Sequence, residues 1–280
     1  MSAPASALVD PQWLADRLGD AGLSIVDASW HMPADGRDAR AEFEAVHIPG
    51  AVFFDIDAIA DTAIRLPHML VSEETFASLV GALGISDTDT IVVYDTVGLF
   101  SAARAWWNFR IMGAEKVFVL SGGLPGWRKA GLAIESGPVH PEPVRFNTRF
   151  RPGSAVSAQQ ILAMLDDPGR AQIVDVRSAA RFNAEVDEPR PGVRRGRIPG
   201  SLNLPFGALV EDGRLRDAAG LMRAIAATGI DPDKPVITSC GSGVTAPILN
   251  LALAEAGYDH MMVYDGSWAE WGADPALPLG

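Results

Sequence analysis

An internal repeat constrains the fold of this chain more strongly than any other feature. Four segments of the first half recur in the same order in the second half, at offsets of 148, 150, 145 and 144 residues. The matching pairs are Ile25–Asp27 with Ile173–Asp175, His47–Phe54 with Arg197–Leu204, Gly84–Asp95 with Gly229–Cys240, and Val119–Trp127 with Val263–Trp271. This spacing is the length of a domain and far exceeds the period of a solenoid repeat. The sequence therefore predicts two homologous domains in tandem.

The boundary between the two domains is expected where the hydrophobic periodicity lapses and prolines gather. This happens over residues 136–153, which contain four prolines. We therefore predict a first domain over residues 1–135, a linker over 136–153 and a second domain over 154–280.

Each half alternates short runs of β-branched residues with amphipathic segments. The runs predict strands at Leu23–Val26, Thr90–Tyr94, Lys116–Leu120, Gln172–Val176, Pro235–Ser239 and Met261–Tyr264. Helix starts are indicated at Asp10 with Pro11, at Ser72 and at Ser157. Apolar strands that alternate with helices are typical of a parallel sheet covered on both faces. We expect an α/β protein of two tandem domains, each a mainly parallel sheet flanked by helices. We interpret Trp106 and Trp107 as helix packing rather than a ligand platform.

Composition narrows the classes of partner and compartment. The chain has 23 Lys and Arg against 35 Asp and Glu, a net charge of -12 that repels the backbone of nucleic acids. No run approaches the roughly 18 consecutive apolar residues of a membrane helix, and no basic residue precedes Arg17, which argues against a secretory signal. Cys240 is the single cysteine, so an intramolecular disulfide and a cysteine-rich zinc site are excluded. We expect a cytoplasmic protein with no nucleic acid partner, no membrane attachment and no metal site.

The single cysteine lies in a loop that favours anions. Pro235–Cys240 predicts a buried strand, Ala246–Ala256 predicts the following helix, and Gly241–Thr245 connects them. In parallel sheets, ligands bind beyond the carboxyl ends of the strands, where such a loop and the helix N-terminus direct backbone N–H groups inward. Those donors and the helix dipole would stabilise a thiolate. Cys240 is therefore a candidate nucleophile.

Three other interpretations of this loop remain. Cys240 could be a small buried hydrophobe, which is the usual state of a free cysteine. The residues Gly241–Ala246 also fit the dinucleotide fingerprint G-x-G-x-x-A, with Asp265 to bind a ribose, but only 15 residues follow Asp265 and a Rossmann half needs more. Cysteine phosphatases have a similar loop that ends in an arginine, whereas position 246 is alanine here.

Several motifs together resemble one enzyme family. The paired I-V-D and I-P-G blocks, the tail D-G-S-W-x-E-W and the segment Cys240–Ala246 resemble the two-domain rhodanese-like sulfurtransferases, specifically the 3-mercaptopyruvate branch, over nearly the whole chain. The thiosulfate branch carries basic residues after the cysteine, as C-R-K-G-V-T-A, whereas this chain has Gly241 and Ser242. The first half has Asp95 where the second has Cys240. The resemblance therefore implies one catalytic and one non-catalytic domain, with the active site between them.

The resemblance also implies roles for individual residues. Ser242, His68 and Asp57 match a Ser-His-Asp relay beside the cysteine, and the enolate that sulfur abstraction leaves behind needs a proton. The backbone N–H groups of the loop would hold the anionic sulfur. This role falls to Gly241, Gly243, Val244 and Thr245. Without the resemblance, His68 is interpreted as a loop histidine and Asp57 as a solvated acid.

Substrate binding is expected to be cationic. Residues 177–197 contain six arginines and three acids, although the whole chain is strongly acidic. Guanidinium groups bind the carboxylate of an α-keto acid through two hydrogen bonds. The family's G-R-F and E-P-R segments match at Arg181 and Arg190, with Ala180 in place of the glycine.

The other arginines of this stretch have structural interpretations. For Arg194 and Arg195 we expect pairing with surface acids. In the family the second I-P-G block also reads H-I-P-G, and Arg197 replaces its histidine here, which we interpret as a change of structural contact.

The predicted activity is the transfer of the sulfur of 3-mercaptopyruvate through a Cys240 persulfide to a thiol or cyanide acceptor, with release of pyruvate. The acceptor would be a thioredoxin-like protein or a small thiol. No metal or organic cofactor is expected, because the cysteine itself carries the sulfur. The alternatives are a thiosulfate sulfurtransferase with the same nucleophile and a non-enzymatic persulfide carrier or redox-sensing module.

Overall fold

The structure is a computed structural model that describes residues 6–167 and 169–280. It divides into two compact units. The first contains the chain up to Asp61, Leu70–Arg151 and Asp212–Arg214, and the second contains Thr62–Met69, Pro152–Glu211 and Leu215–Gly280. The domain limits predicted at residues 135 and 154 stay predictions.

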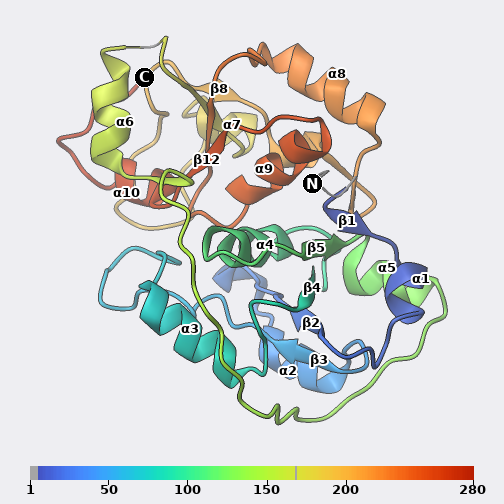
Figure 1. Ribbon diagram of the computed structural model, residues 1–280. Helices are drawn as coiled ribbons and strands as arrows, with labels where there is room; N and C mark the ends of the chain where they lie inside the picture. Colours follow the sequence, from blue (N-terminus) through green and yellow to red (C-terminus); the bar gives the residue numbers. More distant parts are fainter. Residues whose placement is uncertain (1–5, 168) are drawn as a thin grey trace. The chain divides into compact units, whose positions relative to one another are not determined.

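The first unit is built on a parallel sheet with helices on both faces (Figure 1). Its elements are β1 (Leu8–Val9), α1 (Pro11–Ala15), β2 (Leu23–Asp27), a 3-10 turn (Pro33–Asp35), α2 (Ala39–Ala45), β3 (Ala51–Phe53), α3 (Glu73–Ala82), β4 (Thr90–Tyr94), α4 (Ala102–Ile111), β5 (Val117–Leu120) and α5 (Gly123–Lys129). Val92 and Tyr94 of β4 pack in the cluster to which α1, α2 and α5 contribute. Since side chains alternate along a strand, Ile91 and Val93 face the opposite side.

The second unit repeats this plan. Its elements are β6 (Ala155–Val156), α6 (Ala158–Leu165), β7 (Gln172–Asp175), α7 (Ala179–Phe182), β8 (Leu202–Asn203), a 3-10 turn (Phe206–Ala208), β9 (Val210–Glu211), β10 (Arg214–Leu215), α8 (Ala218–Thr228), β11 (Val236–Ser239), α9 (Ala246–Glu255), β12 (Met261–Tyr264) and α10 (Ser267–Trp271). Ile161 of α6 and Trp268 and Trp271 of α10 share a core cluster with Ile173 and Ile237 of the sheet. Strands β9 and β10 form a separate two-stranded sheet.

The two large sheets have the same topology. Within the described residues the strand orders are β1-β5-β4-β2-β3 and β6-β12-β11-β7-β8, and every pair of neighbouring strands in these two sheets is parallel. Counted by position in each half, both orders are first, fifth, fourth, second, third. The carboxyl ends of β4 and β11, the central strands, therefore carry Asp95 and Cys240 at equivalent places.

The helices begin where the sequence predicts. Ser157 caps α6 with a full capping box, in which its side chain accepts from Gln160 N and the Gln160 side chain accepts from Ser157 N. The Ser72 side chain caps α3 by accepting from Thr75 N, and Pro11 opens α1. Trp106 and Trp107 both lie buried in α4, as expected for helix packing.

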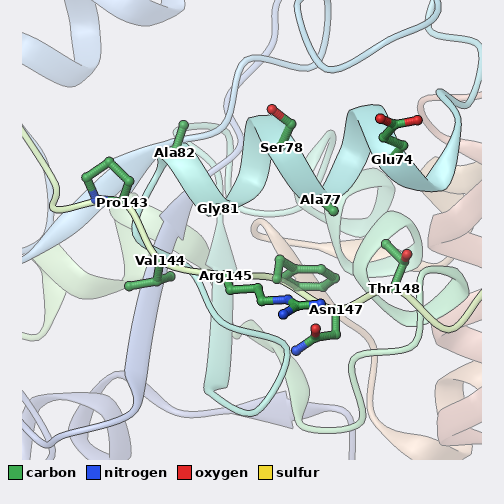
Figure 2. A pocket seen from close by; sticks show the side chains of 11 residues that line it. Glu74, Ala77, Ser78, Gly81, Ala82, Pro143, Val144, Arg145, Asn147 and Thr148 are labelled. Carbon is green, nitrogen blue, oxygen red and sulfur yellow. The ribbon is translucent and has the colours of Figure 1, made fainter.

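The predicted linker belongs to the first unit as far as Arg151, and its last two residues belong to the second. Residues 136–153, all of which the structure describes, form no helix or strand. Residues 143–148 run beside α3 along a groove (Figure 2), and Val144 N donates to Gly81 O at 2.9 Å. A side chain at position 81 would collide with the backbone of this segment, because a Cβ built on Gly81 would lie 2.4 Å from Val144 O. Phe146 is buried against Phe76 and Phe109.

None of the helices among the described residues is both long and apolar enough to cross a membrane.

Candidate active site

The loop after β11 brings hydrogen-bond donors to the single thiol. Cys240 follows the last residue of β11, and α9 begins at Ala246 with Thr245 as its N-cap. Gly243 N donates to Cys240 Sγ at 3.1 Å. Gly243 has a φ of +79°, a left-handed conformation that glycine adopts without strain and that turns its N–H back towards the sulfur. One of the backbone donors predicted for this loop, Gly243 N–H, is therefore directed at the thiol.

Cys240 is buried, with 2% of its surface exposed. Burial is what the interpretation as a structural hydrophobe predicts, but its sulfur does not face hydrocarbon alone. Ser267 Oγ lies 3.9 Å from Cys240 Sγ and accepts a hydrogen bond from Cys240 N at 3.1 Å. The same hydroxyl donates to Tyr264 O at 2.8 Å. The sulfur thus receives a backbone hydrogen bond from Gly243 N and lies beside the Ser267 hydroxyl, whose proton is donated to Tyr264 O.

Ser267 was not among the residues predicted for the site. It is the first residue of α10, is fully buried and has a φ of +50°, which is uncommon for a residue with a side chain. The sequence did hold a signal for Ser267. It lies in the D-G-S-W motif, which follows β12 directly, and the matching segment of the first half, residues 121–124, follows β5 in the same way.

The equivalent loop of the first unit shows what this geometry can hold. Asp95 occupies the position of Cys240, is fully buried and accepts five backbone N–H groups. Oδ1 accepts from Val97 and Gly98 at 2.9 and 2.8 Å, and Oδ2 accepts from Phe100, Ser101 and Ala102 at 2.7, 2.9 and 2.9 Å. The loop of the first unit, residues 95–101, therefore encloses an anion in N–H groups, and the cysteine loop, residues 240–245, is one residue shorter. In the first unit that anion is the chain's own carboxylate.

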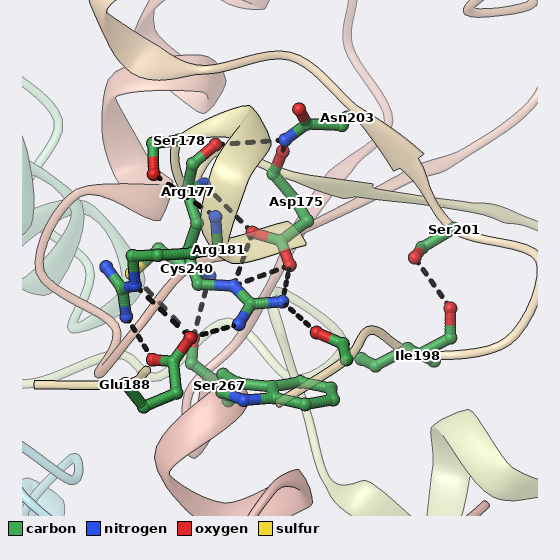
Figure 3. Close-up of polar contacts among 12 residues, drawn as sticks. Asp175, Arg177, Ser178, Arg181, Glu188, Ile198, Ser201, Asn203, Cys240 and Ser267 are labelled. Atoms are coloured by element: carbon green, nitrogen blue, oxygen red, sulfur yellow. Dashed lines mark hydrogen bonds and ion pairs between the residues drawn. The ribbon is translucent and has the colours of Figure 1, made fainter. Parts of the chain in front are cut away.

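A chain of ion pairs reaches the cysteine loop in the second unit (Figure 3). Asp175, at the end of β7, accepts from Arg177 Nε at 2.9 Å and from Arg177 Nη2 at 2.7 Å. Glu188 Oε1 accepts from Arg177 Nη1 at 2.7 Å and from Arg181 Nε at 3.2 Å, and Glu188 Oε2 pairs with Arg181 Nη2. Burial raises the pKa of the Asp175 carboxyl, and the charge and hydrogen bonds of Arg177 oppose that rise.

Arg181 lies directly against the loop. A Cβ built on Gly241 would be 2.9 Å from Arg181 Nη2, so a glycine at this position leaves room for the guanidinium. Arg181 starts from α7, whose N-cap Ser178 accepts from Arg181 N. The structure therefore brings together Cys240, Gly241, Gly243 and Arg181. The roles predicted for them stay predictions.

The other predicted loop residues lie where the sequence places them. Ser242 and Thr245 are half-buried, Val244 is buried, and Ser242 Oγ makes no hydrogen bond to any described residue. Arg190 is half-buried in the irregular segment that follows α7.

His68 and Asp57, the other two members of the predicted relay, belong to different units. His68 lies in Thr62–Met69, which clusters with the second unit, and is buried with a φ of +60°. Asp57 lies in the first unit, is exposed and accepts from Trp30 Nε1 at 2.9 Å. The relay of Ser242, His68 and Asp57 stays a prediction.

The prediction for Arg194 was wrong. Its guanidinium pairs with no surface acid among the described residues, and donates instead to the carbonyl groups of Trp271, Gly272, Asp274 and Leu277. These are carbonyls at and beyond the end of α10, which helical bonding leaves without donors. Arg194 therefore attaches the C-terminal segment to the second unit.

Arg195 and Arg197 have the structural roles that the sequence suggested. Arg195 pairs with the exposed Asp187 at 2.8 Å. The Arg197 guanidinium lies 5.1 Å from the centre of the Phe182 ring, a cation–π contact. In the first unit the matching His47 stacks on Phe43 with ring centres 4.3 Å apart, so the substitution exchanges one aromatic contact for another.

The described residues contain no group of three or more His, Cys, Asp or Glu side chains that could hold a metal ion. The chemistry that the site offers is that of a thiol beside backbone donors, a hydroxyl and a guanidinium. Such a site can hold an anionic sulfur and bind a carboxylate close to it.

Comparison with known proteins agrees with this geometry. Residues 10–130 and 157–274 each match the family model of the rhodanese-like domain. The chain belongs to the rhodanese-like family. The resemblance inferred from the sequence is confirmed, and so is the α/β fold of two tandem rhodanese-like domains with parallel sheets.

Individual relatives within the rhodanese-like family cover almost the whole chain. It is 46% identical over 272 residues to the 3-mercaptopyruvate sulfurtransferase of Escherichia coli strain K12, which covers 97% of this chain and 96% of that protein. It is 41% identical over 273 residues to the thiosulfate sulfurtransferase of Bos taurus, covering 95% and 91%. The crystal structure of SseA from Escherichia coli, described as a rhodanese fold of 3-mercaptopyruvate sulfotransferases, matches with a TM-score of 0.87 at 44% identity, over 94% of this chain and 99% of SseA.

Proposed function

We propose that this chain is an enzyme that transfers the sulfur of 3-mercaptopyruvate to an acceptor through a persulfide on Cys240. The observation that carries the proposal is the hydrogen bond from Gly243 N to Cys240 Sγ in a loop whose duplicate surrounds a carboxylate with five N–H groups. Relatives that cover almost the whole chain bear the name 3-mercaptopyruvate sulfurtransferase, which supports the choice of donor.

In the first half-reaction the Cys240 thiolate attacks the sulfur of the donor. A bond forms between the two sulfur atoms, the bond from the donor sulfur to C3 breaks, and its electron pair passes to carbon as the enolate of pyruvate. The new persulfide carries the donor's thiol proton. Transfer of that proton to C3 of the enolate gives pyruvate and an anionic persulfide on Cys240. The loop N–H groups stabilise this anion, as the matching groups stabilise Asp95 in the first unit.

The surrounding residues hold the two reactants. Arg181 and Arg190 bind the carboxylate of the donor, and the position of the Arg181 guanidinium beside Gly241 supports that role for Arg181. Ser267 positions Cys240 by accepting from its backbone N–H. His68 is proposed to carry the persulfide proton to C3 of the enolate, with Ser242 and Asp57 as its partners in the relay.

In the second half-reaction a thiol acceptor, either a thioredoxin-like protein or a small thiol, attacks the outer sulfur of the persulfide and regenerates the Cys240 thiolate. Acceptors of this kind are kept reduced in the cytoplasm, which is where we place the reaction. No cofactor enters either half-reaction.

A turnover experiment separates this proposal from a carrier. With 3-mercaptopyruvate and excess dithiothreitol, we expect many molecules of pyruvate per molecule of protein, and none from Cys240→Ser. A single stoichiometric burst of pyruvate would show a persulfide carrier instead.

Thiosulfate is a second candidate donor, because the bovine relative is named thiosulfate sulfurtransferase. With thiosulfate the leaving group is sulfite, so the release of sulfite and of pyruvate at matched donor concentrations shows which donor is preferred.

A further inference from the structure

We propose that Glu188 sets the preference of this site for a singly charged sulfur donor over a doubly charged one. The inference rests on the proposed function and adds a residue that determines specificity. It starts from the ion pairs that reach the cysteine loop in the second unit (Figure 3).

Glu188 is a buried carboxylate between two guanidinium groups. Only 4% of its side chain is exposed, against 0% for Arg177 and 25% for Arg181. It receives one hydrogen bond from Arg177 and two from Arg181. At such low exposure the charge of Glu188 is weakly screened by solvent and ions.

Arg177 already has a carboxylate of its own. Asp175 binds it through both oxygens, and Gly196 O accepts from Arg177 Nη2 at 2.8 Å. The negative charge of Glu188 is therefore balanced mainly by Arg181. Asp175, Arg177, Glu188 and Arg181 together have no net charge.

This balance affects the residue that lies against the loop. Arg181 Nη2 lies beside Gly241, which is next to Cys240, so close that a Cβ built on Gly241 would be 2.9 Å from it. With Glu188 attached, Arg181 offers directed hydrogen bonds to a carboxylate but little net positive potential. The loop itself supplies no cation, since Gly241 and Ser242 are neutral.

Net potential distinguishes donors by charge. The 3-mercaptopyruvate carboxylate carries one negative charge and thiosulfate carries two, so an added positive charge attracts thiosulfate about twice as strongly in free energy. At an effective relative permittivity of about 20, a unit charge about 10 Å away changes the binding of another unit charge by about tenfold. An unpaired arginine at this site would strengthen the binding of thiosulfate more than that of 3-mercaptopyruvate. The electrically neutral cluster does not provide this extra attraction.

The test compares donor preference in variants. The readout is the ratio of kcat/KM for thiosulfate, measured by sulfite release, to kcat/KM for 3-mercaptopyruvate, measured by pyruvate release. Glu188→Gln removes the charge and keeps the size, and we expect the ratio to rise about tenfold. Glu188→Asp keeps the charge and should leave the ratio within about twofold of wild type.

Two further variants complete the design. Asp187→Asn is the matched control, because it removes the same charge from the neighbouring residue, whose side chain is 85% exposed, and should not change the ratio. Asp175→Asn removes a charge from the same cluster beyond Arg177. Because Asp175 lies farther from Arg181, Asp175→Asn should raise the ratio by less than Glu188→Gln does. If Glu188→Gln does not fold, the same rise in Asp175→Asn is the result that the inference predicts.

The outcomes separate the inference from the proposed function. An unchanged ratio in folded Glu188→Gln, or an equal rise in Asp187→Asn, would overturn the role of Glu188. Equal losses for both donors would show that Glu188 only supports the structure. Failure of the wild type to release pyruvate would instead refute the proposed function.

Discussion

The loop of the first unit provides a sharp test of how strongly this geometry binds an anion. Asp95→Asn replaces a buried carboxylate that accepts five backbone N–H groups. An asparagine has one oxygen and one NH2 group, so at least two of the five N–H groups would face a donor. Each hydrogen bond to a charged acceptor contributes roughly 1.5–3 kcal/mol. Allowing for relaxation of the loop, we expect a loss of about 4 kcal/mol in the free energy of unfolding of the first unit.

A thermal melt followed by circular dichroism measures this loss. For a chain of this size a change of 1 kcal/mol shifts the Tm by roughly 2–4 °C, so Asp95→Asn should lower the first transition by about 10 °C. The control is Asp38→Asn, which makes the same substitution at the exposed N-cap of α2, where one N–H is accepted at 3.0 Å and asparagine caps equally well. A melting temperature for Asp95→Asn within about 3 °C of wild type would refute the reasoning, because the loop would then not depend on an anion.

Three further predictions follow from the same structure. Ser267→Ala should slow the formation of the persulfide by about tenfold in stopped-flow assays, because a hydrogen bond is lost. The control Ser239→Ala removes a buried hydroxyl without a partner among the described residues and should leave this rate unchanged. Equal rates for the two variants would contradict a role for Ser267. Arg181→Ala combined with Arg190→Ala should raise the KM for 3-mercaptopyruvate at least about tenfold in steady-state assays, and an unchanged KM would exclude both as carboxylate ligands. Burial raises the pKa of Asp27 from 3.8 to about 6, so the folded state binds this proton more tightly than the unfolded state, and the contribution of Asp27 to stability falls as the pH rises from 4 towards 7. Asp27→Asn should remove that fall and gain about 3 kcal/mol over wild type between these pH values in urea titrations, and parallel stability profiles for the two proteins would contradict the assignment.

The fold could be predicted largely from local patterns. The strands at Thr90–Tyr94 and Met261–Tyr264 are found as predicted, and the others differ by one residue at an end. The repeat implied equal topologies, which the two strand orders show. Short strands such as β1 and β6 were missed, because two residues are too few to show a periodicity.

The site was predictable where its residues are adjacent in the chain. Cys240 and Gly243 lie in one loop, and a glycine between a strand and a helix is a local signal. Ser267 is 27 residues from Cys240, and its position depends on a left-handed backbone at the start of α10. Arg194 reaches the carbonyl of Asp274, 80 residues away, and an arginine's choice between an acid and a backbone carbonyl depends on tertiary packing. The sequence showed Glu188 only as part of the E-P-R motif. Its ion pairs with Arg177, which follows β7, and with Arg181 of α7 depend on the tertiary structure.

The central claim is that Cys240 receives the sulfur. Its most direct test is the intact mass of the protein after treatment with 3-mercaptopyruvate and removal of excess donor, without an acceptor. We predict one added sulfur atom on the wild type, its loss on addition of dithiothreitol, and no added sulfur on Cys240→Ser. A wild type without added sulfur, or a Cys240→Ser variant that still gains one, would contradict the account.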